Sequence, residues 1–185
     1  MHWDMTQRIQ PIEPPYTPEV QAAFDIVMRG SPPLNLFRTV ANNPRVLQRM
    51  MAGGLLDRGS ISLRQRELMV LRTCARCGAE YEWAVHVGGF GAKVAWTEEQ
   101  LHASVHGTDR DACWTCVEAL VIRLADALHD AGDVDDELWQ ALRQRYDPPQ
   151  CIELVMLAGL YHAVSFMVRA CRIEAEPGMR AFPQP

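Results

Sequence analysis

The stretch from Ile152 to Cys171 constrains the fold most, because it is the longest apolar run in the chain. It is long enough to cross a bilayer, but it contains Glu153, His162 and Arg169, whose side chains are costly to place in lipid. We therefore predict that it forms the central core helix of an all-α protein with no membrane partner. A helix this apolar in a chain of 185 residues also predicts burial against a second subunit.

Length and composition are those of one globular domain. Apolar residues make up 48% of the 185 residues and charged residues 22%. The net charge of −5 leaves no basic surplus to neutralise phosphates, which argues against a nucleic-acid partner. The first ten residues are polar and carry no secretory apolar segment, so we expect a cytoplasmic protein.

The chain divides into an arm, a helical domain and a tail. Three prolines predict an extended arm over residues 1–16, and the domain then covers residues 17–176, with a C-terminal tail over 177–185. Within the domain, no segment alternates apolar and polar residues as a strand does, and no repeat is present. Proline, glycine and cap residues instead separate a series of helices.

Cap residues place the helices that matter for function. Ser62 with Gln65 forms a capping box that begins the helix carrying Glu67, and Gly78 interrupts that helix. A second helix then carries the segment that follows Gly78. Further along, Asp111 is predicted to cap a long apolar helix.

The groups best suited to chemistry are two carboxylates and an imidazole. Glu82 and His86 are four residues apart and share one face of the predicted helix, and Glu67 lies on the preceding helix. A carboxylate–imidazole pair commonly moves protons near neutral pH. Two interpretations are open: an exposed ion pair contributing about 0.3–0.5 kcal/mol, or a buried site, which the neighbouring Tyr81 and Trp83 favour.

His162 and the cysteines offer further candidates. A lone histidine midway along an apolar helix is usually a neutral core residue, although His162 becomes a site residue if it faces His86. The two Cys-x-x-Cys pairs are Cys74 with Cys77 and Cys113 with Cys116. Three interpretations of these cysteines are open. They could be small buried hydrophobic residues, or one pair could be redox-active, most plausibly the second pair because it lies at a helix N-terminus. The four together could also bind zinc, although the spacer between the pairs is unusually long. We predict neither a metal site nor a cofactor.

Three segments resemble the carboxymuconolactone decarboxylase family, whose superfamily also contains alkylhydroperoxidase D. They are Arg66-Glu67-Leu68, the Tyr81-Glu82-Trp83-x-x-His86 block and Thr97-Glu98-Glu99-Gln100-Leu101. The similarity extends from about Pro32 to Ile173 and includes Gly159-Leu160-Tyr161-His162. It implies an alkylhydroperoxidase D-like helical bundle that self-associates as a dimer, trimer or hexamer, with the active site near a subunit contact.

The resemblance also exposes a departure from the peroxidase branch of that superfamily. There the glutamate corresponds to Glu67 and the histidine to His86, but the two cysteine positions fall on Ala79 and Glu82. A thiol peroxidase needs a thiolate and a resolving thiol, which neither alanine nor glutamate supplies. The first Cys-x-x-Cys pair lies five residues earlier, more than one helical turn away.

Three functions follow as hypotheses. The first is a cofactor-free, decarboxylase-like lyase for a small organic acid or lactone, with His86 as acid/base, Glu82 orienting it and Glu67 relaying a proton. Its pocket is predicted to be lined by Tyr81, Trp83 and His162. The second is an alkylhydroperoxidase-like thiol oxidoreductase that uses a displaced Cys-x-x-Cys pair. The third is a non-catalytic helical oligomer that binds a small ligand, with Glu82 and His86 as a structural pair.

Overall fold

The computed structural model describes residues 7–185, and over that range the chain forms helices and no strand. The prediction of an all-α fold is therefore confirmed. In chain order the helices are α1 (Pro18–Met28), α2 (Asn35–Val40), α3 (Pro44–Ala52), α4 (Leu63–Arg76), α5 (Glu80–Val94), α6 (Glu98–His106), α7 (Cys116–Ala131), α8 (Asp136–Arg143) and α9 (Pro148–Cys171).

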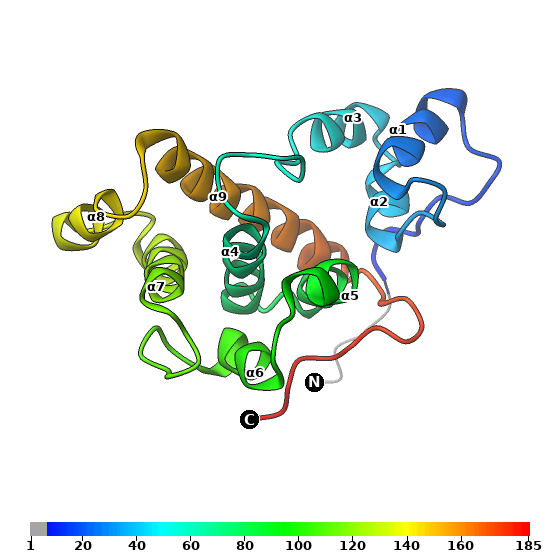
Figure 1. Cartoon of the computed structure of the whole chain (residues 1–185). Coiled ribbons are helices and arrows are strands. Elements are labelled where there is room, and N and C mark those ends of the chain that lie inside the picture. Colours follow the sequence, from blue (N-terminus) through cyan, green and yellow to red (C-terminus); the bar gives the residue numbers. More distant parts are fainter. Residues whose placement is uncertain (1–6) are drawn as a thin grey trace.

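The long helix α9 runs through the middle of the molecule, as Figure 1 shows. It begins at a capping box formed by Asp147 and Gln150, and it packs against α4, α5, α7 and α8. Leu154 and Leu157 on its inner face are completely buried. By length and composition α9 could cross a membrane, but core helices of soluble proteins have the same properties.

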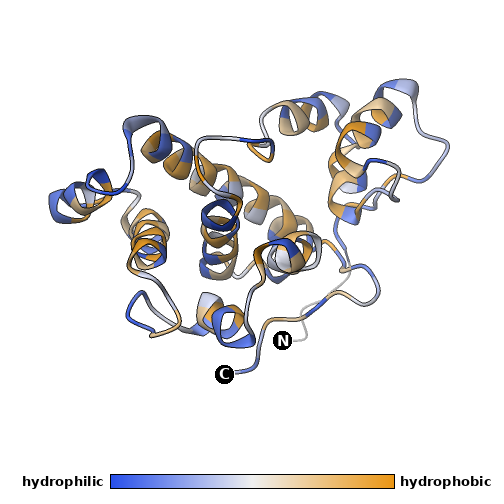
Figure 2. Cartoon of the chain, viewed as in Figure 1, coloured by the Kyte–Doolittle hydropathy of each residue, from blue (hydrophilic) through white to orange (hydrophobic). Residues whose placement is uncertain are grey.

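The outer face of α9 carries a row of exposed apolar side chains. Ile152, Met156 and Phe166 are each more than half exposed, and Figure 2 shows how apolar this helix is along its length. Their spacing of four and ten residues places them on one side of the helix. A continuous apolar face is typical of a protein contact, so the predicted association with a second subunit stays a proposal supported by this row.

Helix α4 is the element that connects the site to the core. Its capping box of Ser62 and Gln65 forms as predicted, and the helix ends at Arg76, shortly before Gly78, whose φ of +64° suits glycine. α4 packs against α5, α6, α7 and α9. Glu67 is therefore 1% exposed although it is charged, so it must be paired inside the protein.

Helix α7 begins later than the sequence predicts. Its cap is Thr115, in a capping box with Glu118, and its first residue is Cys116. Asp111 instead accepts a hydrogen bond from the backbone N–H of Thr108, which closes a turn before the helix. An aspartate favours caps and turns for the same reason, so the pattern could not distinguish the two.

The two ends of the chain pack against the helical body. The described part of the predicted arm, residues 7–16, is extended, and residues 1–6 lie outside the described range. The tail runs along α5 and α6 (Figure 1), where Phe182 contacts Trp83 edge-on at 5.4 Å. Arg180 pairs with Glu98 on α6. The tail therefore covers one flank of α5.

Candidate active site

A cleft of about 1020 Å³ lies between α1–α3 with the following loop, residues 53–62, and the helices α4, α5 and α9. Most of its lining is apolar, as in small-molecule sites generally. The polar residues in its lining include Arg66 of α4, Glu82 and Lys93 of α5, Glu153 and Tyr161 of α9, and Arg29, Asp57 and Arg58 of the loops. The sequence-predicted group on α4 and α5 thus lies at the wall of this cleft.

His86 is held by Glu67 directly behind that wall. Its Nδ1 lies 2.7 Å from Glu67 Oε2, and both side chains are almost completely buried. The other Glu67 oxygen accepts from Arg66 Nε at 2.8 Å. Arg66 also donates to the carbonyl of Leu56. Glu67 therefore fixes the ring of His86, the role that the sequence prediction gave to Glu82.

The second ring nitrogen of His86 faces Tyr161 and Glu82. His86 Nε2 lies 2.8 Å from Tyr161 Oη and 3.5 Å from Glu82 Oε1. The predicted Glu82–His86 contact therefore exists, but it is the longer of the two. Glu82 Oε2 is buried and has no hydrogen-bond partner among residues 7–185. A buried carboxylate oxygen without a partner is unusual, and it marks Glu82 as a residue of the site.

These contacts set the proton positions. Burial alone lowers the pKa of His86, but the hydrogen bonds and negative charges of Glu67 and Glu82 outweigh it and raise the pKa to about 9. Burial raises the pKa of Tyr161 well above its usual value, and the charge of Glu82 adds to this. At neutral pH His86 is thus an imidazolium that donates to Glu67 and Tyr161, and the Tyr161 O–H remains free to donate into the cleft.

Helix α5 aligns this group by its periodicity. Glu82, His86 and Phe90 are spaced by four residues and share one face. The rings of His86 and Phe90 stack with centroids 5.4 Å apart. The guanidinium of Arg66 lies 4.9 Å from the Phe90 ring centroid, in cation–π geometry. Phe90 therefore supports both His86 and Arg66 from the side of the cleft.

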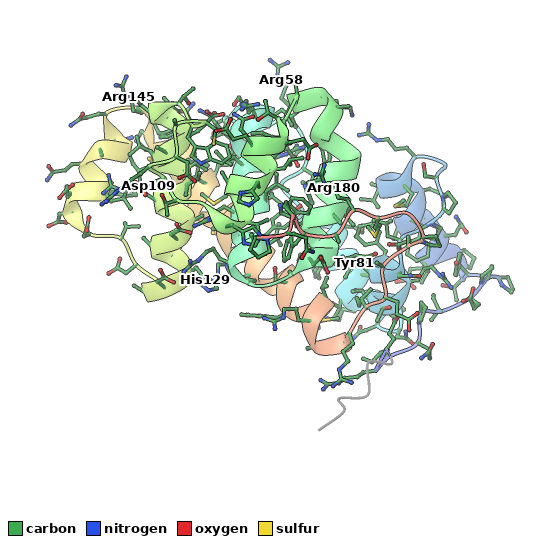
Figure 3. All side chains as sticks on the ribbon, turned by 90° about the horizontal axis from the view of Figure 1, so that it is seen from below. Arg58, Tyr81, Asp109, His129, Arg145 and Arg180 are labelled. Atoms are coloured by element: carbon green, nitrogen blue, oxygen red, sulfur yellow. The ribbon has the colours of Figure 1, made fainter. Side chains whose placement is uncertain are left out.

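Tyr81 and Trp83 do not line this cleft, which corrects the sequence prediction. The hydroxyl of Tyr81 accepts from the Leu36 N–H and donates to Glu176, and Figure 3 shows Tyr81 beside the C-terminal segment. Trp83 is completely buried and donates its indole N–H to Ser104. Each helical residue turns by about 100°, so the neighbours of Glu82 point away from it.

His162 is likewise not part of the cleft, and the preceding residue, Tyr161, lines the cleft instead. His162 Nε2 lies 3.1 Å from His129 Nδ1, on the side of α9 that faces α7. The sequence prediction named His162 and not Tyr161, because histidine is the more common acid or base. The signal was present: Leu154, Leu157 and Tyr161 follow the buried three-and-four spacing of α9, and His162 does not.

The cysteines of residues 7–185 are all free thiols. Cys74 is completely buried behind the site, and burial, followed by the charge of Glu82, raises its pKa well above the usual value. A thiol in this state is a poor nucleophile. Cys77 contacts His129 near the C-terminal end of α7, whereas Cys116 begins α7, about 20 Å away along the helix. Cys113 lies in the turn before Cys116, so a four-cysteine zinc site is excluded.

No family model and no curated protein matches the chain by sequence. Solved structures match it closely in fold. An uncharacterised peroxidase-related protein from Silicibacter sp. TM1040 superimposes with a TM-score of 0.78 at 16% identity, covering 96% of this chain and 95% of that one. The debrominase Bmp8 in complex with 2,3,4-tribromopyrrole gives a TM-score of 0.75 at 15% identity, covering 94% of each chain.

A third match carries the family name in its description. A peroxidase-related protein from Ralstonia eutropha JMP134, described as an alkylhydroperoxidase AhpD core, has a TM-score of 0.73 at 16% identity and covers 93% of this chain and 95% of that one. The chain therefore has the alkylhydroperoxidase D-like fold, and the resemblance seen in the sequence is confirmed at this level. The neighbours include a debrominase and peroxidase-related proteins.

Proposed function

We propose that the protein is a cofactor-free acid–base enzyme, similar to carboxymuconolactone decarboxylase, that protonates a small organic acid or lactone in the cleft. One observation carries the proposal: His86 is held between Glu67 at 2.7 Å and Tyr161 at 2.8 Å, with Tyr161 at the cleft wall. This arrangement supplies a proton to a defined point. It has no accessible thiolate of the kind that redox chemistry requires.

The proposed step is a decarboxylation. The bond between the substrate carbon and its carboxylate breaks, carbon dioxide leaves, and the electron pair is delocalised into a neighbouring carbonyl as an enolate. Tyr161 then donates its proton to the carbon, and His86 Nε2 returns a proton to Tyr161. Arg66 is already bonded to Glu67 and Leu56, so Lys93, Arg29 and Arg58, which also line the cleft, are the cations available to the substrate carboxylate and the developing oxyanion.

Glu82 also has a role in this scheme. Its charge holds the proton on His86 before the reaction. Glu67 keeps the imidazole oriented and is itself held by Arg66. Glu67 and Arg66 are therefore positioning residues, while Tyr161 is the proton donor.

The experiment measures turnover of small unsaturated lactone acids in D₂O. NMR would follow carbon dioxide release together with deuterium uptake into the product, for the wild type and for Tyr161→Phe. Loss of the donor should lower kcat by about 10²- to 10⁴-fold. Tyr146→Phe is the matched control, because Tyr146 is also buried but bonds to Gln65, away from the cleft. Equal kcat in Tyr161→Phe and the wild type would contradict the proposal.

The other two hypotheses make different predictions in the same assays. A thiol oxidoreductase would consume peroxide and lose that activity when Cys74, Cys77, Cys113 and Cys116 are all replaced by serine, a change that leaves Tyr161 in place. The buried thiol of Cys74 argues against this outcome. A non-catalytic oligomer would bind the lactone acids without turnover, and His86→Gln would change its assembly or melting temperature only.

A further inference from the structure

A second cluster of reactive side chains lies on the opposite side of α9 from the cleft. It consists of Cys77 at the end of α4, His129 in the last turn of α7 and His162 of α9. Cys77 Sγ lies 3.7 Å from His129 Nδ1, and His129 Nδ1 lies 3.1 Å from His162 Nε2. One ligand atom from each residue lies within 4.8 Å of the others.

We propose that Cys77, His129 and His162 form a binding site for a zinc ion. Tetrahedral zinc with a Zn–S bond of about 2.3 Å and Zn–N bonds of about 2.0–2.1 Å requires an S···N separation of about 3.6 Å and an N···N separation of about 3.3 Å. In the structure the S···N separation is 3.7 Å and the N···N separation is 3.1 Å, and each lies close to the value that zinc requires. The third separation, from Cys77 Sγ to His162 Nε2, is within 4.8 Å, so a small side-chain adjustment brings all three atoms around one ion.

The orientation of His162 supports metal binding. Its Nδ1 lies 2.9 Å from the carbonyl oxygen of Ala158, one turn earlier on α9, and the N–H must donate there. The lone pair of Nε2 is then directed at the other two ligands. Metal-bound histidines characteristically donate their second ring N–H to a carbonyl or carboxylate in this way.

The surrounding charges tolerate a dication. Arg76 of α4 and Arg169 of α9 face the cluster, as do Asp126 and Asp130 of α7. Arg76 pairs with both aspartates, and Arg169 donates to the backbone carbonyl of Cys77. Arg72 also pairs with Asp126, so the three arginines exceed the two aspartates by one positive charge, and the Cys77 thiolate offsets that charge when the metal binds. Neighbouring charge therefore does not oppose a divalent cation.

The ligand types select the metal. One thiolate and two imidazoles disfavour magnesium and calcium, which take oxygen ligands, and they suit zinc or its spectroscopic substitute cobalt. Three protein ligands leave a fourth position for a water or a small anion. His129 and His162 are half-buried, so this position faces solvent and the ion can enter without unfolding the protein. The bound ion would join α4, α7 and α9 from outside the core.

The test is equilibrium dialysis of the full chain against zinc, with the bound metal measured by mass spectrometry. We expect one tightly bound zinc per chain in the wild type and none in Cys77→Ser, His129→Gln or His162→Gln. Cobalt loading should give a thiolate-to-cobalt charge-transfer band, which Cys77→Ser abolishes. At a zinc concentration 100-fold above Kd the Tm should rise by about 5–10 °C, and circular dichroism shows that each metal-free variant is folded.

Two control variants separate this site from other metal-binding groups. His102→Gln with His106→Gln removes the other close histidine pair, on α6, and Cys113→Ser with Cys116→Ser removes the exposed thiols. Both controls should keep the stoichiometry and the cobalt band. Loss of the metal in a control, or its full retention in His129→Gln and His162→Gln, would overturn the proposal. None of these measurements depends on lactone turnover, so they test the zinc site independently of the proposed activity.

Discussion

The charge on His86 should make the stability of the folded protein depend on pH in a specific window. Its pKa is about 9 in the folded protein and about 6.5 in the unfolded chain. Because the folded pKa is the higher one, the folded state binds the proton more tightly. The stabilisation is therefore fully present below pH 6.5 and is lost as the pH rises through 9.

The size of this effect follows from the two pKa values. Each unit of difference corresponds to about 1.4 kcal/mol, so His86 contributes about 3 kcal/mol at pH 6 and almost nothing at pH 10. Because His86 is 3% exposed, solvent does not screen this contribution appreciably. Groups distant from His86 titrate alike in the wild type and in a His86→Gln variant, so the difference between the two reports His86 and its direct partners Glu67, Glu82 and Tyr161.

The assay is urea unfolding of both proteins at pH 6, 7, 8, 9 and 10. The free-energy advantage of the wild type over His86→Gln should shrink by about 3 kcal/mol between the extremes. Nitrogen NMR of the His86 ring should show its titration near pH 9 directly. Parallel stability curves, or a ring that is neutral at pH 7, would refute the assignment of an imidazolium and with it the direction of proton flow from His86 to Tyr161.

Three further predictions concern the core, the tail and the outer face of α9. Leu157→Ala should lower the free energy of unfolding by about 2–5 kcal/mol in urea titrations, because Leu157 is completely buried; the exposed Ile152→Ala is its control, and equal effects would contradict the packing described. Phe182→Ala should remove an aromatic contact worth about 0.5–1.5 kcal/mol and shift the fluorescence of Trp83 to the red, and an unchanged spectrum would show that the tail does not cover it. Phe166→Glu should lower the mass seen by analytical ultracentrifugation, whereas Trp139→Glu on α8 should not, and two unchanged masses would exclude this face of α9 as the subunit contact.

The helices and the two carboxylates could be predicted from sequence because their signals are local. Ser62 with Gln65 is a cap pattern that spans four residues, and the structure has a helix beginning there. The spacing of Glu82 and His86 fixes their shared face whatever the rest of the chain does. The prediction of Asp111 as a helix cap was wrong because an aspartate side chain also accepts backbone N–H hydrogen bonds in turns.

The partners of His86 could not be predicted with the same success because they depend on how helices pack. Glu67 and Tyr161 meet His86 only when α4, α5 and α9 come together, and sequence spacing does not measure the rotation of one helix against another. An error of one residue turns a side chain by about 100°, which separates Tyr161 from His162. The cluster of Cys77, His129 and His162 has no local sequence pattern that predicts it, because its three members come from three different parts of the chain.

The burial of His86 has a consequence for the catalytic cycle that we propose. His86 is 3% exposed and Glu67 1%, and on the cleft side Tyr161 and Glu82 stand between the imidazole and the solvent. A proton spent on the substrate must therefore return through the same opening by which the product leaves. Reprotonation of the imidazole is then coupled to release of the product. The slow step of turnover should therefore be sensitive to solvent deuterium even when carbon–carbon cleavage is fast.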